Sequence, residues 1–199
     1  ILPVVSDDLL TGRAKLCPQC GYLHPIASGP GQDLCDYCRT PLREELHQLF
    51  RLQNVSTKRR ERINCDEEER VRLGYDICTT VRFVEHGGQT SYRTAKVECD
   101  GHVLAQLAYG QAATLWRINL GWKNRAHKDE YGFILDIERG YWASNQRDPD
   151  QDDDDPLSPR RVRVIPFVED HRNSLLLQFT HPQDDFVMAS IEAALKNAI

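Results

Sequence analysis

The spacing of apolar residues along this 199-residue chain changes from helical to strand-like near Tyr75. Beyond that point, apolar and polar residues alternate in short stretches bounded by glycine-containing turns, a pattern typical of half-buried β-strands. Gly87 and Gly88 separate two such stretches and predict a hairpin, and Asp100-Gly101 predicts a second turn. The stretches expected to form strands are 75–86, 91–99, 102–110, 113–122, 131–142, 161–170 and 174–179. Several short strands joined by turns favour a mostly antiparallel sheet or a partly open barrel.

The stretch 113–122 carries the clearest alternation, with large apolar side chains on one face. These side chains are Trp116, Ile118, Leu120 and Trp122. Tryptophan on a strand can stack on nucleic-acid bases, an alternative that also applies to Tyr141 and Trp142. The density of aromatic residues favours the core for Trp116 and Trp122.

Two segments before Tyr75 show helical spacing instead. In 41–55, Pro41 suits the first turn of a helix, and apolar residues recur every three or four positions. Those positions are Leu42, Leu46, Leu49 and Phe50. A second, shorter helix is expected from Asp66, which suits the N-cap, to Gly74, which suits the C-terminal end. The acidic residues 67–69 in its first turn complement the helix dipole.

Four cysteines form two Cys-x-x-Cys pairs, Cys17 with Cys20 and Cys35 with Cys38, separated by a Gly/Pro-rich stretch. This is the ligand set of a tetrahedral zinc ribbon, because each pair turns tightly enough to aim two thiolates at one ion. Gly21 suits the turn directly after the first pair, where the backbone often needs a positive φ. A closed four-sulfur site leaves no position for a substrate, so the pattern predicts a structural Zn²⁺ ion.

Disulfides are the main alternative for these cysteines, and they require an oxidising compartment. No signal peptide precedes the pairs, and the other cysteines are odd in number and scattered: Cys65, Cys78 and Cys99. Both features favour reduced thiols in a cytoplasmic protein. A thioredoxin-like redox pair explains one Cys-x-x-Cys but not two. His24 lies between the pairs and could replace a thiolate, but four cysteines already complete the site, which favours a loop histidine.

The formal charge of −5 arises from one stretch rather than from the whole chain. Six acidic residues lie between Asp148 and Asp155, and the rest of the chain holds 24 acidic residues against 25 Lys and Arg. The composition of 147–160 predicts a solvated loop, because it is rich in Asp and Pro and nearly free of apolar residues. Calcium binding is the alternative, but the EF-hand spacing and its turn glycine are absent.

Sequence motifs for nucleotide hydrolysis are absent, including the G-x-x-x-x-G-K-[ST] phosphate loop, so the chain is expected to be no enzyme by itself. Asp136 and Glu138 form one candidate pair for a metal-dependent nuclease, since residues two apart on a strand share a face. Nucleases of this kind need a lysine two positions later, where this chain has Gly140. An ionic surface face of a strand is therefore the favoured interpretation.

A basic run follows the first predicted helix and could contact nucleic-acid phosphates. It consists of Lys58, Arg59, Arg60 and Arg62. Further basic residues lie near the cysteine pairs: Arg13, Lys15, Arg39 and Arg43. Neighbouring acids can also pair with these cations within the chain, so the run is a hypothesis for DNA contact rather than a signature.

The order of motifs resembles the carboxy-terminal half of large bacterial superfamily-2 helicases. The resemblance lies in CPQCG, CDYC, RERINCDEEERVRLGYDI, YGQAATLWRINLGW, GFILDIERGYW and VIPFVEDHRNSLLL. Such helicases include that of the DISARM anti-phage system and relatives with the MrfA-type (DUF1998-associated) zinc-binding domain, whose opening helix the final SIEAALKNAI resembles. The resemblance implies an ATP-dependent DNA translocase whose motor lobes precede Ile1. The cysteine cluster of that later domain is absent, so Cys17 to Cys38 do not correspond to it.

These observations predict an α+β fold with an N-terminal zinc ribbon, a mostly antiparallel sheet or partly open barrel, and a C-terminal helix. The expected divisions are 1–45 for the zinc ribbon, 46–74 for a helical connector with the basic run, 75–182 for the β-rich body, and 183–199 for an amphipathic helix. The expected function is a non-catalytic accessory domain that supports DNA or motor-lobe contacts in anti-phage defence. The alternatives are a protein–protein adaptor that binds no nucleic acid and a metal-dependent nuclease.

Overall fold

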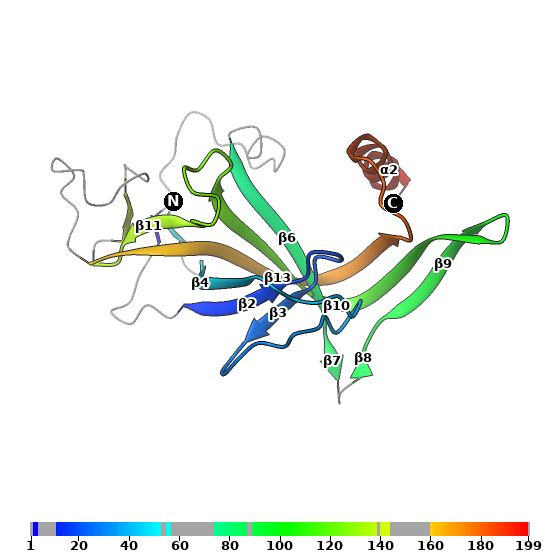
Figure 1. The fold of residues 1–199 in the computed structure, drawn as a ribbon, viewed down its shortest axis with the longest axis horizontal. Coiled ribbons are helices and arrows are strands. Elements are labelled where there is room, and N and C mark those ends of the chain that lie inside the picture. The colour runs from blue at the N-terminus through cyan, green and yellow to red at the C-terminus, as the bar shows by residue number, and fades with distance from the viewer. Residues whose placement is uncertain are drawn as a thin grey trace. The chain divides into compact units, whose positions relative to one another are not determined.

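The structure is a computed structural model, shown in Figure 1. It describes residues 2–3, 11–52, 55–56, 74–86, 89–138, 140–143 and 160–198. The predicted strand-rich architecture with a C-terminal helix is confirmed, and the sheet is open rather than closed. The chain forms two compact units: unit 1 comprises Ile1–Arg82 and Thr114–His171, and unit 2 comprises Phe83–Ala113 and Arg172–Ile199.

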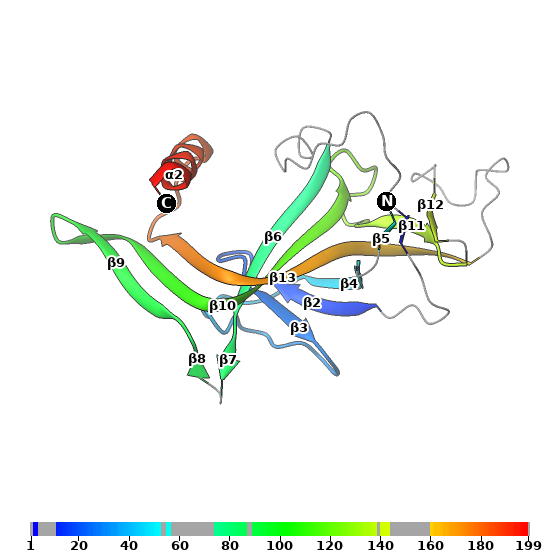
Figure 2. The same ribbon diagram turned by 180° about the vertical axis from the view of Figure 1, so that it is seen from behind.

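Unit 1 contains the strands that surround the cysteines. Its main path of hydrogen-bonded strands is β12-β11-β13-β4-β2-β3, and β10 pairs with both β13 and β6. The strands are β2 (Gly12–Leu16), β3 (Leu23–Ile26), β4 (Glu45–Arg51), β6 (Tyr75–Phe83), β10 (His102–Trp122), β11 (Phe133–Asp136), β12 (Tyr141–Trp142) and β13 (Arg161–Phe179). Two of them, β10 and β13, are shared with unit 2. A short separate pair joins β1 (Leu2–Pro3) to β5 (Val55–Ser56). Figure 2 shows β2 and β3 as a hairpin beside β4.

The β4 strand corrects the prediction of a helix over 41–55. Leu46 pairs with Ala14 of β2 in antiparallel register, while Leu49 pairs with Ile165 of β13 in parallel register. Gln48 has a φ of 58°, and the register with β2 shifts in the same region, between Gly12 and Ala14. A bulge of this kind resets the alternation of side chains along the strand.

The bulge explains why helical spacing was misleading here. Leu46 and Leu49 lie three residues apart, yet both are buried in the same core cluster. Phe50, the next residue, is buried in a second cluster with Leu135 and Val164. An i, i+3, i+4 pattern of apolar residues therefore arises from a bulged strand buried on both faces.

The core of unit 1 confirms part of the predicted apolar face of 113–122. Trp116 and Ile118 are buried in the cluster that contains Leu46 and Leu49. Trp122, expected in the core, is 40% exposed, and its ring stacks on Tyr75 with centroids 4.4 Å apart. This difference arises because Trp122 is the last residue of β10.

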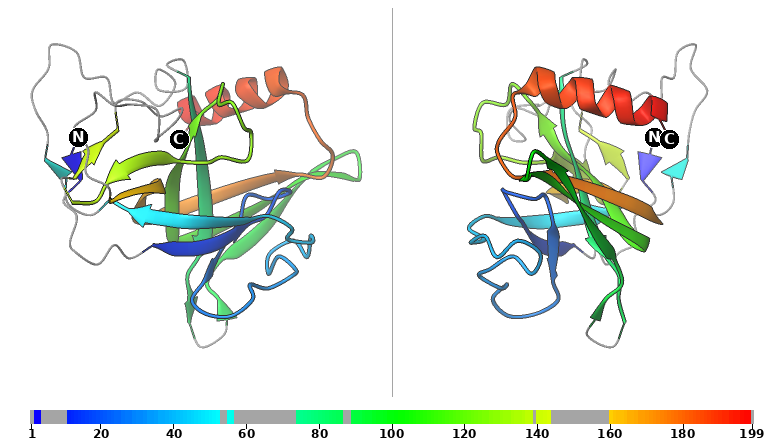
Figure 3. Two further views of the ribbon diagram at one scale, coloured as in Figure 1. Left: turned by 60° about the vertical axis from the view of Figure 1, so that its left-hand side comes forward. Right: turned by 90° about the vertical axis from the view of Figure 1, so that its right-hand side faces the viewer.

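Unit 2 is built on hairpins. The strand β9 (Arg93–Cys99) pairs antiparallel with β10 through the predicted turn at Asp100-Gly101, whose φ angles of 50° and 77° suit a type I′ turn. Figure 3 shows the two strands of this hairpin in green. The predicted hairpin around 87–88 is confirmed only as the short pair β7 (Glu85–His86) and β8 (Gln89–Thr90), because the longer strands β6 and β9 both pair with β10.

The predicted C-terminal helix is confirmed as α2 (Asp185–Ala198). Asp184 caps it: its Oδ1 accepts a hydrogen bond of 2.9 Å from the Val187 N–H. None of its side chains is buried, and Phe186 is 87% exposed. The apolar positions of α2 therefore find no core within unit 2.

Candidate metal centre

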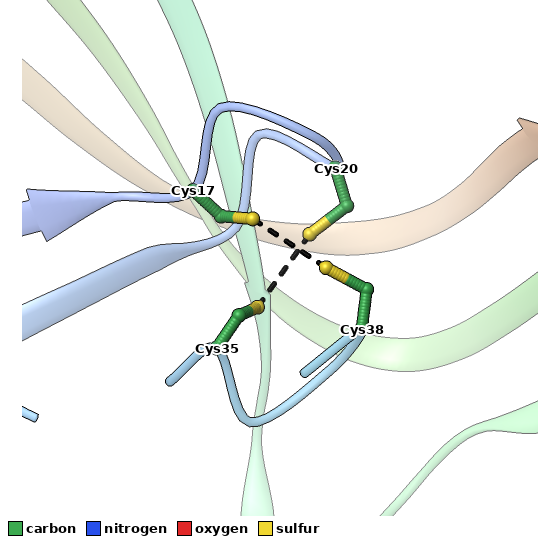
Figure 4. A group of neighbouring side chains, drawn as sticks. All are labelled: Cys17, Cys20, Cys35 and Cys38. Atoms are coloured by element: carbon green, nitrogen blue, oxygen red, sulfur yellow. Dashed lines mark hydrogen bonds between the residues drawn. The ribbon is translucent and has the colours of Figure 1, made fainter. Parts of the chain in front are cut away.

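Four thiols converge in unit 1. The Sγ atoms of Cys17, Cys20, Cys35 and Cys38 all lie within 4.8 Å of one another (Figure 4). The Sγ atoms of Cys17 and Cys38 are 3.5 Å apart and those of Cys20 and Cys35 are 3.6 Å apart, so each of these contacts links one Cys-x-x-Cys pair to the other. Cys17 and Cys35 are buried, while the other two thiols are partly exposed. The sequence therefore identified all four members of this cluster.

The sulfur positions fit one tetrahedral metal ion. A Zn–S bond of about 2.3 Å places neighbouring sulfurs of a tetrahedron about 3.8 Å apart. The Cys17–Cys38 and Cys20–Cys35 sulfur separations of 3.5 and 3.6 Å are close to this value. A disulfide requires roughly 2.05 Å, so the four thiols are free. The cluster can thus hold a metal ion with four thiolate ligands.

The first cysteine pair occupies the turn of the β2–β3 hairpin. Cys17 follows the last residue of β2, and Tyr22 precedes β3. The N–H of Cys17 donates to the Tyr22 carbonyl at 3.0 Å, and the N–H of Gly21 donates to the Cys17 carbonyl at 3.0 Å. Gly21 has a φ of 68°, as the sequence predicted for this position.

The second pair repeats this geometry outside any hairpin. The N–H of Cys35 donates to the Thr40 carbonyl, and the N–H of Arg39 donates to the Cys35 carbonyl, both at 2.9 Å. Arg39 has a φ of 63°, the left-handed conformation that glycine adopts in the first pair. A single bridge between Leu34 and Pro41 closes this loop. The two loops are therefore equivalent in backbone structure but not in sequence.

Burial and hydrogen bonds shift the pKa values of three of the thiols when no metal is bound. It raises the pKa of Cys20 and of Cys35, so both favour the neutral thiol. Burial also acts to raise the pKa of Cys38, but hydrogen bonds with the Thr40 hydroxyl and backbone lower it to about 7. A metal ion must displace the thiol protons, which couples its binding to proton release.

His24 corrects the prediction of a loop histidine. It lies in β3, is 2% exposed, and places Nε2 3.4 Å from the Cys35 Sγ. Burial lowers its pKa, which favours the neutral ring. Strand alternation could have identified His24 from the sequence. Residues two apart on a strand share a face, and His24 lies two residues after Tyr22, which directly follows the first cysteine loop.

Aromatic and cationic groups surround the second cysteine loop. The Tyr22 ring stacks on Tyr37 with centroids 5.5 Å apart, and the Arg82 guanidinium lies 5.4 Å from the Tyr22 ring centroid. Arg82 also lies 3.5 Å from an Asp36 carboxylate oxygen. Tyr22 forms an isolated bridge with Val81 of β6, so β6 packs against the cysteine loops.

Several other residues singled out in the sequence fall outside the part of the chain that the structure describes. The basic run Lys58, Arg59, Arg60 and Arg62 lies outside the described residues, as do Cys65 and the acidic stretch 147–159. Near the cysteines, Arg13 pairs with Glu45 at 3.1 Å, and Lys15 pairs with Asp33 at 3.6 Å. These two cations therefore have acidic partners within the chain.

Asp136 and Glu138 do not form a carboxylate pair on one strand face. The strand β11 ends at Asp136, which is fully buried, and Glu138 lies exposed in the turn that follows. The Asp136 Oδ1 accepts the backbone N–H of Glu138 at 3.0 Å. The predicted shared face is therefore wrong, because the chain turns before reaching Glu138, and Asp136 stabilises that turn.

Comparisons of the chain with protein-family models, curated proteins and solved structures found no match.

Among the described residues, no helix combines the length and apolarity that a membrane span requires.

Proposed function

We propose that this chain is a zinc-stabilised, non-catalytic accessory domain of an ATP-dependent DNA helicase or translocase that acts in anti-phage defence. The observation that carries the zinc proposal is the closed four-thiol cluster, in which all sulfurs lie within 4.8 Å of one another. The helicase setting rests on the resemblance in motif order. The cytoplasm, where thiols stay reduced, is the compartment proposed with it.

Zinc is the proposed ion because two Cys-x-x-Cys pairs in tight turns are its usual structural site. The second cysteine loop also needs such an ion. Between β3 and β4, residues 27–44 form no strand, and most of their side chains are exposed or only partly buried. A segment with so little apolar burial gains its folding free energy from the metal that joins it to the β2–β3 hairpin.

The zinc site would act on function by fixing positions. It joins the second cysteine loop to the hairpin, and the bridge between Tyr22 and Val81 joins that hairpin to β6. The strand β5 precedes the basic run in the chain and β6 follows it, and both contribute to unit 1, which holds the four cysteines. Lys58 to Arg62 would contact DNA phosphates from this region.

Metal content is the first test of the proposal. Elemental analysis of protein purified under reducing conditions without chelators should find one zinc per chain. Removal of the ion by a strong chelator should lower the unfolding midpoint, because the metal binds the folded state. Less than stoichiometric zinc, with iron in its place, would contradict the proposed ion.

DNA binding is the second test. The affinity of the zinc-loaded chain for a short duplex or single strand should fall linearly with salt concentration on a logarithmic scale. Changing Arg59, Arg60 and Arg62 to Ala should weaken binding and reduce the slope by roughly 0.9 for each lost contact with duplex phosphates. A matched control removes three exposed cations elsewhere: Arg93, Lys96 and Lys123. Equal losses in both triple variants would contradict a specific basic surface.

The adaptor function remains the second candidate, and unit 2 favours it. Its helix α2 buries no side chain, and several large apolar residues are exposed on α2 and on the strands. They are Val97, Leu104, Tyr109, Leu175, Phe186, Val187, Met188 and Leu195. Large exposed apolar side chains are candidates for contacts with another protein. Absence of DNA binding by the zinc-loaded chain at low salt would favour the adaptor.

A further inference from the structure

The ring of His24 lies between the four-cysteine cluster and three polar side chains, Gln32, Arg82 and Asp36. Its Nε2 is 3.4 Å from the Cys35 Sγ, and its Nδ1 is 3.0 Å from the Gln32 Nε2. On the Nδ1 side, an Arg82 Nη1 atom lies at 3.4 Å and an Asp36 Oδ2 atom at 3.5 Å. Which ring nitrogen carries the proton decides what His24 does to the sulfur.

The orientation of the Gln32 amide fixes this tautomer. Gln32 donates through Nε2 to the Leu34 carbonyl at 2.8 Å, and a carbonyl accepts but never donates. The same amide NH₂ faces the His24 Nδ1, which must therefore act as an acceptor. Arg82 presents a second donor to this nitrogen. Arg82 also pairs with Asp36, whose carboxylate is the acceptor on the Nδ1 side. The Gln32 donor at 3.0 Å is nearer to Nδ1 than the Asp36 oxygen at 3.5 Å, which favours the tautomer that carries its proton on Nε2, directed at Cys35.

We infer that His24 is a positioning residue of the metal centre that donates its Nε2–H to the Cys35 thiolate and is held in that tautomer by Gln32. This inference rests on the proposed zinc site. Four thiolates around Zn²⁺ leave a net charge of −2 in a partly buried site, and N–H groups aimed at sulfur stabilise that charge. The donation also lowers the nucleophilicity of Cys35 by occupying a sulfur lone pair.

The contact distinguishes Cys35 from its equivalent in the other loop. Cys17 and Cys35 occupy the same position in the two repeated loops, and both are buried. The backbone pattern is shared, so the side chain of His24 breaks the equivalence. Its strand β3 carries it to the second loop, while Gln32 reaches it from the chain preceding that loop. His24 thus links the two halves of the site.

The first experiment reads the tautomer directly in the wild-type chain. Long-range ¹H–¹⁵N correlation spectra of the zinc-loaded protein distinguish a protonated ring nitrogen from an unprotonated one. The His24 signals are assigned by their loss in His24→Gln. We expect a neutral ring with the proton on Nε2. A proton on Nδ1 would overturn the inference, whatever the metal content.

The second experiment measures the effect on the sulfur and the metal. His24→Phe keeps a ring but removes both nitrogens, while His24→Gln retains an N–H donor at a similar reach. We expect His24→Phe to weaken zinc binding about tenfold to a hundredfold and to speed alkylation of Cys35 in the zinc-loaded protein about tenfold. His24→Gln should restore most of both properties. His47→Phe, at a side chain 62% exposed, is the matched control.

The outcomes separate this inference from the zinc proposal. Wild-type protein without stoichiometric zinc would overturn the zinc proposal, and the inference with it. Zinc bound equally by wild type and His24→Phe, with equal rates of Cys35 alkylation, would overturn the inference alone. Peptide-resolved mass spectrometry gives the alkylation rate of each cysteine separately, so a general loosening of the site would appear at Cys17 as well and would also contradict a specific contact.

Discussion

Gly21 and Arg39 occupy equivalent positions, each directly after the second cysteine of its pair, with φ angles of 68° and 63°. Each N–H donates to the carbonyl of the first cysteine in its loop. The left-handed conformation costs a residue with a Cβ about 1–2 kcal/mol, whereas glycine adopts it readily. The backbone geometry that the two cysteine loops share is therefore supplied by glycine in one loop and imposed on arginine in the other.

Substitution at these two positions should have opposite effects. Arg39→Gly should stabilise the zinc-loaded protein by about 1 kcal/mol by relieving the backbone, and Gly21→Ala should destabilise it by a similar amount. A Cβ at Gly21 would meet no atom within 4 Å, so only the backbone conformation opposes the alanine. Urea denaturation of the zinc-loaded variants gives both values. Arg39→Ala controls for the lost side chain; stability equal to Arg39→Gly would contradict a backbone origin.

Loss of one thiol should abolish stable metal binding. Cys35→Ser replaces a buried ligand with a hydroxyl that binds zinc poorly, and it leaves three thiolates around the ion. We expect less than one tenth of the wild-type zinc affinity in a competition assay with a chromophoric chelator. Cys99→Ser is the matched control because Cys99 is exposed and lies on β9. Equal metal retention by both variants would show that the cluster is not the binding site.

The four-cysteine cluster could be predicted from the sequence because the constraint within each pair is local. Two cysteines three positions apart meet in one turn, whatever the rest of the chain does. The partner of Cys35 could not be predicted in the same way. His24 reaches that sulfur only because β3 pairs with β2, which places the strand beside the second loop. Contacts that depend on strand pairing are set by the tertiary structure rather than by spacing.

The fold shows the same division between local and non-local signals. The turn at Asp100-Gly101 and the helix α2 were predicted because their determinants lie within a few residues. The strand β4 was predicted as a helix because its bulge at Gln48 imitates helical spacing. The sequence predicts two strands, 161–170 and 174–179, with a break between them. The structure has one continuous strand, β13, because pairing with neighbouring strands extends it through 171–173.

Glu169 should stabilise unit 1 through the indole of Trp116. Its Oε2 accepts the Trp116 Nε1–H at 3.0 Å, and its Oε1 lies 3.4 Å from Arg51. Glu169→Ala leaves a nearly buried indole N–H without this acceptor and should cost about 1–3 kcal/mol. Glu169→Gln keeps an acceptor and should cost less. Thermal unfolding of both variants tests this; equal losses would assign the effect to charge rather than to the hydrogen bond.

Gly132 should be intolerant of any side chain. Its φ is 85°, and an added Cβ would overlap the Val164 carbonyl oxygen of β13. Gly132 also donates its N–H to the Leu120 carbonyl at 2.9 Å, so the segment cannot shift without losing that bond. Overpacking and backbone strain together should cost roughly 3–5 kcal/mol in Gly132→Ala.

Gly29→Ala is the matched control for this position. Gly29 has a φ of 71° but no atom within 4 Å of an added Cβ, so its alanine variant should lose only about 1–2 kcal/mol. The difference between the two variants in urea denaturation then isolates the collision with Val164. If both alanine variants unfold at the same midpoint, the close approach of Gly132 to β13 contributes nothing, and strand β13 does not pass where the structure places it. A larger loss at Gly132 shows that this contact requires glycine.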